Sequence, residues 1–143
     1  MRACAAVLAL LAAQGAPAAA AIVPDCAGPV AVARAVVMRV DRDGSLILDH
    51  GRAAVLEGIR VPLRDDGAPP LLADDTLVAL AQLVRDGPVA LTATAPMRDR
   101  YDRLRAQAIK SVWLQRALLE RGLARVMIAP DRSDCAPDLY EAE

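Results

Sequence analysis

Two short turns divide residues 30–59 into three aliphatic runs, and this pattern limits the fold more than any other part of the sequence. The first turn is Asp-Arg-Asp-Gly at 41–44, and the second is Asp-His-Gly at 49–51. Aspartate followed by glycine favours a tight hairpin, and the runs beside the turns are rich in Val, Leu and Ile, which favour strands. We therefore expect a three-stranded meander with strands at 30–40, 45–48 and 53–59.

The middle of the chain predicts one helix followed by two strands. A loop rich in proline, glycine and aspartate covers 60–70. Asp74, Asp75 and Thr76 are candidate N-caps for a helix that would end at Gly87. The aliphatic runs after it predict strands at 89–94 and 103–109, on either side of a polar loop at 95–102.

The last part of the chain predicts further helices. Ser111 is a candidate cap for a helix that ends near Gly122, residues 123–128 predict a short extended piece, and Pro137 opens a third helix. Three strands, a helix, two strands and more helices form the order of a five-stranded Greek-key barrel of the OB type. We therefore expect a mainly β, α+β fold: an OB-fold barrel with about three helices.

The first 21 residues have the order of a secretory signal peptide. A short charged start is followed by an apolar run at 5–13 and by small residues suited to cleavage at 16–21. A membrane anchor needs about 20 strongly apolar residues, which this alanine-rich run does not supply. We expect cleavage near residue 21, a single mature domain at 22–143, no membrane span after cleavage, and a periplasmic or secreted protein.

The cysteines fit this expectation of export. Cys4 would leave with the signal peptide, and Cys26 and Cys135 would remain as an even pair in an oxidising compartment. We expect a structural disulfide between them; the alternative is two buried free thiols. The pair lacks the Cys-x-x-Cys spacing of redox enzymes.

The charge pattern restricts how the chain can bind an anion. The formal net charge is −1, and it becomes −2 when Arg2 is removed with the signal peptide. Bulk electrostatics therefore do not attract a polyanion, and binding would depend on a local cluster. The densest basic run consists of Arg98, Arg100, Arg103 and Arg105, with Tyr101 among them. It predicts either a surface for phosphates and stacked bases or a solvated strand edge paired with neighbouring aspartates.

Trp113 and His50 are each the only residue of their type, and we interpret both as structural and not as functional residues. Trp113 is the only tryptophan of a chain without phenylalanine, and we expect it in the core. His50 is the only histidine, and we expect it to lie exposed in its turn, with no metal to bind.

Two stretches resemble one known family. Residues 40–62 read VDRDGSLILDHGRAAVLEGIRVP, and residues 98–126 read RDRYDRLRAQAIKSVWLQRALLERGLARV. The first resembles the turn, short strand, turn and R-L-x-G-I-D-x-P strand end of thermonucleases, the staphylococcal-nuclease-like family. The second resembles the D-x-Y-G-R strand start of that family, followed by its N-x-x-L-[LV]-x-x-G-L-A-x-V helix. The resemblance implies an OB-type barrel and a nuclease ancestry.

The resemblance also implies a mechanism, and most of its residues are replaced in this chain. Family members hydrolyse phosphodiesters with Ca²⁺ on two Asp, a Glu as general base and two Arg on the phosphate. The first Asp falls on Gly44, or on Asp43 in a shifted alignment, and the second falls on Arg60. One Arg falls on Val55, and the Glu falls on Leu63.

One family residue of this set is kept. The Arg of the Y-G-R motif is Arg103, beside Tyr101, although Asp102 replaces the glycine. Arg60 would repel Ca²⁺ and Leu63 accepts no proton, so the resemblance implies a module without the usual hydrolysis. We expect it to bind an anionic ligand or single-stranded nucleic acid through Arg103, Tyr101 and Arg60, with no cofactor.

Two other functions stay open. A weak or altered metal-dependent nuclease would use relocated carboxylates, with Asp43 as the metal candidate and the pair at 65–66 beside it. Such a site would require Ca²⁺ or a similar cation. The third function is a scaffold that binds an unknown protein partner, since a fold does not fix a function.

Overall fold

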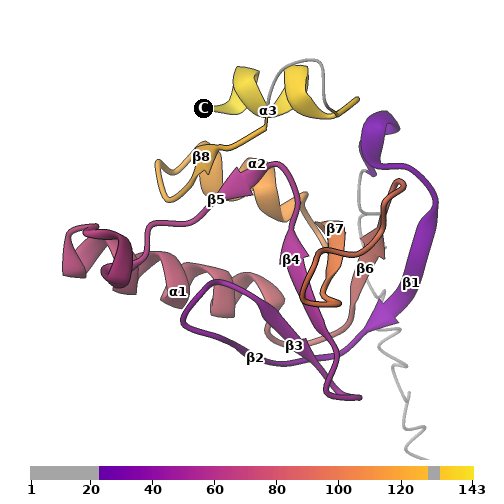
Figure 1. Cartoon of the computed structure of the whole chain (residues 1–143), viewed down its shortest axis with the longest axis horizontal. Helices are drawn as coiled ribbons and strands as arrows, with labels where there is room; N and C mark the ends of the chain where they lie inside the picture. Colours follow the sequence, from indigo (N-terminus) through magenta and orange to yellow (C-terminus); the bar gives the residue numbers. More distant parts are fainter. Residues whose placement is uncertain (1–22, 129–132) are drawn as a thin grey trace, which may run out of the picture.

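The computed structural model describes residues 23–128 and 133–143, so the expected signal peptide at 1–21 lies outside the described residues. This part of the chain forms a mixed α+β structure with three α-helices and eight strands, drawn in Figure 1. None of its helices is long and apolar enough to cross a membrane.

Six strands form the main sheet, in the spatial order β1-β6-β7-β4-β3-β2. Their bounds are β1 Val30–Ala35, β2 Val37–Val40, β3 Leu46–Leu48, β4 Ala53–Leu56, β6 Val89–Thr92 and β7 Leu104–Ile109. All neighbours pair antiparallel except β4 and β7, which run parallel. The remaining strands, β5 (Ile59–Arg60) and β8 (Arg125–Val126), form an antiparallel two-stranded sheet, the β5–β8 ribbon.

The two edge strands of the main sheet are consecutive in the chain. Only Val36 separates β1 from β2, so the strand predicted at 30–40 is present as two pieces that pair with opposite ends of the sheet. Within the described residues, β1 and β2 do not pair with each other, and the sheet is not a closed ring of paired strands. The pairing establishes the α+β class and the antiparallel character of most of the sheet, but not the five-stranded barrel.

The strand predicted at 53–59 ends early because the chain turns at Gly58. Gly58 has φ of 86°, in the left-handed region, and the next two residues pair with β8 instead of the main sheet. A Cβ at this position would lie 2.6 Å from Leu139, so glycine also permits close packing against the last helix.

Helix α1 (Pro70–Val84) begins earlier than predicted. The expectation that Asp74, Asp75 or Thr76 caps it is wrong, because Pro70 occupies the first helical position, where a missing N–H has no cost. Thr76 is instead buried inside the helix, and its hydroxyl donates to the carbonyl oxygens of Leu72 and Leu123.

Helix α2 (Leu114–Leu119) begins later than predicted. The expected cap at Ser111 is wrong because a bridge between Ile109 and Trp113 closes a bend that contains Ser111. Helix α3 (Ala136–Ala142) confirms the third helix.

Aliphatic side chains form the core, as the composition requires. Trp113 is buried, which confirms its structural interpretation, and its Nε1–H donates to Gln107. The buried side chain of Gln115 accepts from the N–H of Ala108 and donates to the carbonyl of Ala106. These hydrogen bonds fix α2 against β7.

The disulfide is confirmed. Cys26 lies in the 3-10 helix η1 (Asp25–Ala27), and Cys135 directly precedes α3. The bond therefore joins the start of the described chain to its last helix, across 109 residues of sequence.

Candidate functional site

The turn at 41–45 and the loop before β7 meet at an arginine, and we call their contact set, Asp43, Ser45, Asp99 and Arg103, the Arg103 corner. The Arg103 guanidinium donates from Nε to Asp99 and from Nη1 to Asp43, both at 2.8 Å. It also donates to the Ser45 hydroxyl at 3.2 Å. Asp43 in turn accepts from the N–H and hydroxyl of Ser45, which shapes the turn.

Asp99 organises the loop that carries Arg103. Its carboxylate accepts hydrogen bonds from the backbone N–H of Tyr101, the backbone N–H of Arg103 and the Arg103 side chain. Burial raises the pKa of the Asp99 carboxyl, but these hydrogen bonds and the Arg103 charge more than offset burial and hold the pKa below its ordinary value. Asp99 is therefore a charged anchor that fixes both the loop and the arginine.

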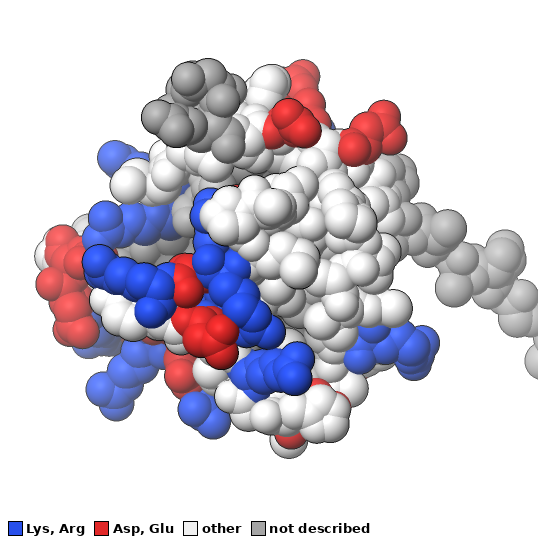
Figure 2. Space-filling model, turned by 45° about the vertical axis from the view of Figure 1, so that its right-hand side comes forward, with Lys and Arg blue, Asp and Glu red and all other residues white. Residues whose placement is uncertain are grey.

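Tyr101 projects from this loop into solvent. The residue is 63% exposed, and its ring centroid lies 4.7 Å from the Arg100 guanidinium carbon and 5.2 Å from that of Arg103. These distances correspond to cation–π contacts, which orient the ring while leaving area for another flat group. On the face in Figure 2, basic side chains surround a small group of acidic ones.

A small cavity of about 110 Å³ lies beside the corner. Its lining consists of Asp43, Gly44, Val55, Leu56, Ile59, Arg60, Val61 and Leu63. The structure thus brings together every position between 43 and 63 that the sequence singled out for metal or phosphate binding. Arg60 and Asp43 are the ionisable members, and Arg60 forms its ion pair with Asp66, outside this cavity lining.

The side chains around this cavity supply too few oxygen ligands for Ca²⁺, which takes six to eight. Asp43 supplies the one carboxylate of the lining, and Arg103 and Ser45 already bind it. Over 23–128 and 133–143, no group of three or more His, Cys, Asp or Glu side chains is arranged to hold a metal ion.

The relocated carboxylates proposed from the sequence are partly dispersed. Asp65 and Asp43 line one cavity of about 530 Å³, together with Asp74. Asp74 is bound by Arg64, and this hydrogen bond lowers the pKa of the Asp74 carboxyl. Asp66 is bound by Arg60. Asp43 and Asp65 therefore share a cavity, but Asp66 does not line it.

The ion pair between Arg105 and Glu57 was not predicted from the sequence. Arg105 lies opposite Val55 in the parallel register of β4 and β7, and it donates to Glu57 at 2.7 Å. The Glu57 side chain is only 10% exposed. Because the two residues are 48 positions apart, only the parallel pairing of their strands reveals the contact.

A cavity of about 410 Å³ adjoins the β5–β8 ribbon and contains Arg60 and Arg125 in its lining. Arg60 therefore lies between this cavity and the smaller one beside the Arg103 corner. His50 takes no part in either, and its side chain is 85% exposed beside Asp49.

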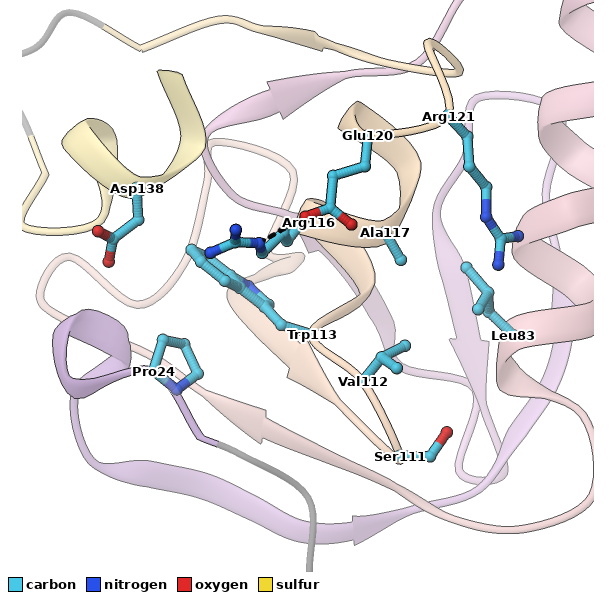
Figure 3. A pocket seen from close by; sticks show the side chains of 10 residues that line it. All are labelled: Pro24, Leu83, Ser111, Val112, Trp113, Arg116, Ala117, Glu120, Arg121 and Asp138. Atoms are coloured by element: carbon cyan, nitrogen blue, oxygen red, sulfur yellow. Dashed lines mark hydrogen bonds and ion pairs between the residues drawn. The ribbon is translucent and has the colours of Figure 1, made fainter. Parts of the chain in front are cut away.

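Another cavity, of about 750 Å³, lies between η1, α2 and α3 (Figure 3). The edge of Trp113 and the exposed Val112 give it apolar surface. Its lining carries two arginines and two carboxylates, of which Arg116 and Glu120 form an ion pair. Equal numbers of opposite charges give it no preference for an ionic ligand.

Comparison with known proteins does not assign a family, since no family model and no curated protein matches the chain. The Arg103 corner and the two cavities at Arg60 are therefore interpreted from their own geometry.

Proposed function

We propose that the protein is an exported, thermonuclease-like module of the OB type that binds single-stranded nucleic acid and does not carry out Ca²⁺-dependent hydrolysis. The observation that carries the proposal is the exposed side chain of Tyr101, whose ring lies within cation–π distance of the guanidinium groups of Arg100 and Arg103. Aromatic rings stack on bases, and arginines bind the phosphates between them.

The strand arrangement supports the OB part of this proposal. The parallel pair β4 and β7 lies inside an otherwise antiparallel sheet, and the edge strands β1 and β2 are two halves of one bent segment. The OB fold is a five-stranded, partly open Greek-key barrel, and a bent segment that pairs at both ends of the sheet is compatible with such an arrangement. The disulfide supports export, because such bonds persist in oxidising compartments.

The backbone at Asp102 supports the resemblance to thermonucleases. Asp102 stands where the family motif has glycine, and its φ is 61°, in the left-handed region that favours glycine. Aspartate tolerates this region better than most residues. The turn that precedes Arg103 therefore has a conformation suited to the family motif even though the residue differs.

The loss of hydrolysis is proposed from the chemistry of the small cavity. Leu63 and Val55 supply no proton acceptor and no cation there, and Arg60 opposes a metal ion. The altered nuclease remains the second candidate, because Asp43 and Asp65 line one cavity. It requires those two carboxylates to recruit a metal ion.

Binding is tested by fluorescence anisotropy of labelled single-stranded DNA and RNA 20-mers at low salt. We expect Tyr101→Ala to weaken binding about tenfold, because stacking on one aromatic ring contributes about 1–3 kcal/mol per base. Tyr140→Ala is the matched control, since Tyr140 lies on α3 and its hydroxyl donates to Ile128. Equal binding by the wild type and Tyr101→Ala would refute the proposed surface.

The same oligonucleotides distinguish the two candidates when they are incubated with Ca²⁺ or Mg²⁺, with and without chelator. We expect intact oligonucleotides in every sample. Cleavage that the chelator stops and Asp65→Asn abolishes would instead assign the protein to the altered nucleases.

A further inference from the structure

Two arginines lie side by side on the β5–β8 ribbon. Arg60 and Arg125 are direct partners in its antiparallel register, so both side chains leave the same face. Like charges in this position destabilise a pair of strands unless an anion lies near them. Arg60 has Asp66 as its ion-pair partner, whereas Arg125 has none among the described residues. The ribbon therefore carries positive charge that no ion pair among the described residues neutralises.

Both arginines line the cavity of about 410 Å³, whose other surface is mainly apolar. The apolar lining includes Val61, Pro62, Leu63, Pro69, Leu72, Leu123 and Met127. The charged lining consists of two arginines and one aspartate, a surplus of one positive charge. The larger cavity between η1, α2 and α3 has no such surplus, so of these two cavities only the ribbon cavity favours an anion by its charge.

The contact with Asp66 shows that the Arg60 guanidinium binds a carboxylate. Asp66 follows β5 on the short 3-10 helix η2 (Arg64–Asp66), and its carboxylate lies against the Arg60 guanidinium. The pair is about half exposed on both sides, and exposed ion pairs of this kind contribute little to stability. A carboxylate from a ligand can therefore replace Asp66 on Arg60 and reach Arg125 as well.

We propose that this face binds an acidic peptide segment of a partner protein. One Asp or Glu carboxylate of the segment bridges Arg60 and Arg125, and its apolar neighbours enter the cavity beside them. The cavity opens onto solvent next to Met127, which is 59% exposed, so it suits an extended chain more than an enclosed small molecule. This site is separate from Tyr101 and does not depend on nucleic-acid binding.

The test is an NMR titration of the ¹⁵N-labelled, disulfide-bonded protein with a blocked pentapeptide that has one aspartate between leucines. We expect shift changes at the amides of Arg60, Leu123, Arg125 and Met127. The matched peptide with asparagine should bind at least about tenfold more weakly, because it lacks the charge-assisted hydrogen bonds. Equal binding of both peptides, or the absence of shifts, would overturn the proposal.

Variants separate the bridging role from a general effect of charge. Arg125→Ala should weaken peptide binding at least about fivefold, while the matched control Arg121→Ala, an exposed arginine that lines another cavity, should not change it. Asp66→Asn should strengthen binding about threefold, because Arg60 loses its internal partner. A purely structural role of Asp66 would not produce that gain.

Two further measurements are needed. A phosphate titration distinguishes a peptide site from an oxyanion site, and Tyr101→Ala distinguishes the peptide site from the proposed nucleic-acid surface. Inorganic phosphate that perturbs the same amides more strongly than the peptide would make this an oxyanion site and overturn the peptide assignment. Tyr101→Ala should leave peptide binding unchanged. In the wild type, peptide binding without oligonucleotide binding would contradict only the proposed function, and oligonucleotide binding without peptide binding would contradict only the peptide site.

Discussion

The Arg103 corner and the β5–β8 ribbon both present arginine next to a carboxylate, but they use the charge differently. Arg103 is bound by two aspartates and a serine, and its side chain is 29% exposed. On the ribbon, Arg60 pairs with one aspartate, Asp66, and Arg125 has no ion-pair partner among the described residues; the Arg60 side chain is 53% exposed. The first arrangement is already complete within the protein, whereas the second leaves Arg125 without an ion-pair partner in the part of the chain that the structure describes.

This difference separates an arginine that stabilises the fold from one that is free to bind. Arg103 links the turn at 41–45 to the loop that begins at Asp99, which are about 60 residues apart in sequence. Any phosphate at Arg103 must compete with Asp43. The Tyr101 ring beside the corner remains open to a ligand, which is why the proposed function depends on the ring more than on the Arg103 guanidinium.

Loss of the disulfide should have the largest effect and should separate the two regions. Cys135→Ser is expected to lower the free energy of unfolding by about 4–5 kcal/mol, because the bond closes a loop of more than 100 residues. Chemical denaturation monitored by tryptophan fluorescence measures this change. Helix α3 also backs the ribbon, since Glu143 accepts a hydrogen bond from the N–H of Val126.

Hydrogen exchange in the same variant sharpens the comparison. We expect amide protection to fall at β8 and α3 and to persist at the Arg103 corner, which α3 does not support. Equal loss of protection in both regions would show that the disulfide stabilises the whole domain uniformly.

Substitution of Arg103 should have the next largest effect. Arg103→Ala is expected to lower the free energy of unfolding by about 2 kcal/mol, because it leaves the mostly buried carboxylate of Asp99 without its guanidinium. Urea denaturation measures the difference. The control is Arg125→Ala, for which we expect a change within about 0.5 kcal/mol, since the lost side chain is an exposed cation with no ion pair to any residue in 23–128 or 133–143. Similar losses for both variants would remove the distinction between the two regions.

The sequence predicted local features better than the contacts that build these regions. The turns at 41–44 and 49–51 and the strand positions follow from short-range patterns of aspartate, glycine and aliphatic residues. The predicted start of α1 was wrong. The two prolines at 69–70 suggested a loop, although proline fits the first turn of a helix. Local patterns therefore gave the elements but not always their first residues.

The contacts of the site depend on register, which no local pattern reveals. The convergence of 43–63 beside Arg103 was implied by the resemblance, and the cavity lining is consistent with it. Arg60 and Arg125 lie opposite each other because β5 pairs with β8. Each of these strands has two residues, which is too short for a strand pattern to be recognised in the sequence. The pair of Arg105 and Glu57 likewise follows from a parallel pairing of strands that the order of elements does not specify residue by residue.

The smallest predicted effect concerns pH and tests whether Asp99 is the anchor of the corner. Its pKa is lower in the folded protein than its ordinary value, so its contribution to stability is present above that ordinary value and is lost as the pH falls through the folded pKa. At neutral pH, Asp99→Asn should lower the free energy of unfolding by about 1 kcal/mol, because neutral hydrogen bonds replace charge-assisted ones.

As the pH falls through the folded pKa of Asp99, the wild-type carboxyl also becomes protonated, and the two proteins should approach the same stability. Urea denaturation from pH 7 to pH 2.5 measures the convergence. Asp74→Asn is the comparison, because the Asp74 pKa is also lowered but its ion pair with Arg64 is exposed, so added salt should reduce its effect more than that of Asp99. A stability difference for Asp99→Asn that does not change with pH would mean that shape, and not charge, holds the Arg103 corner together.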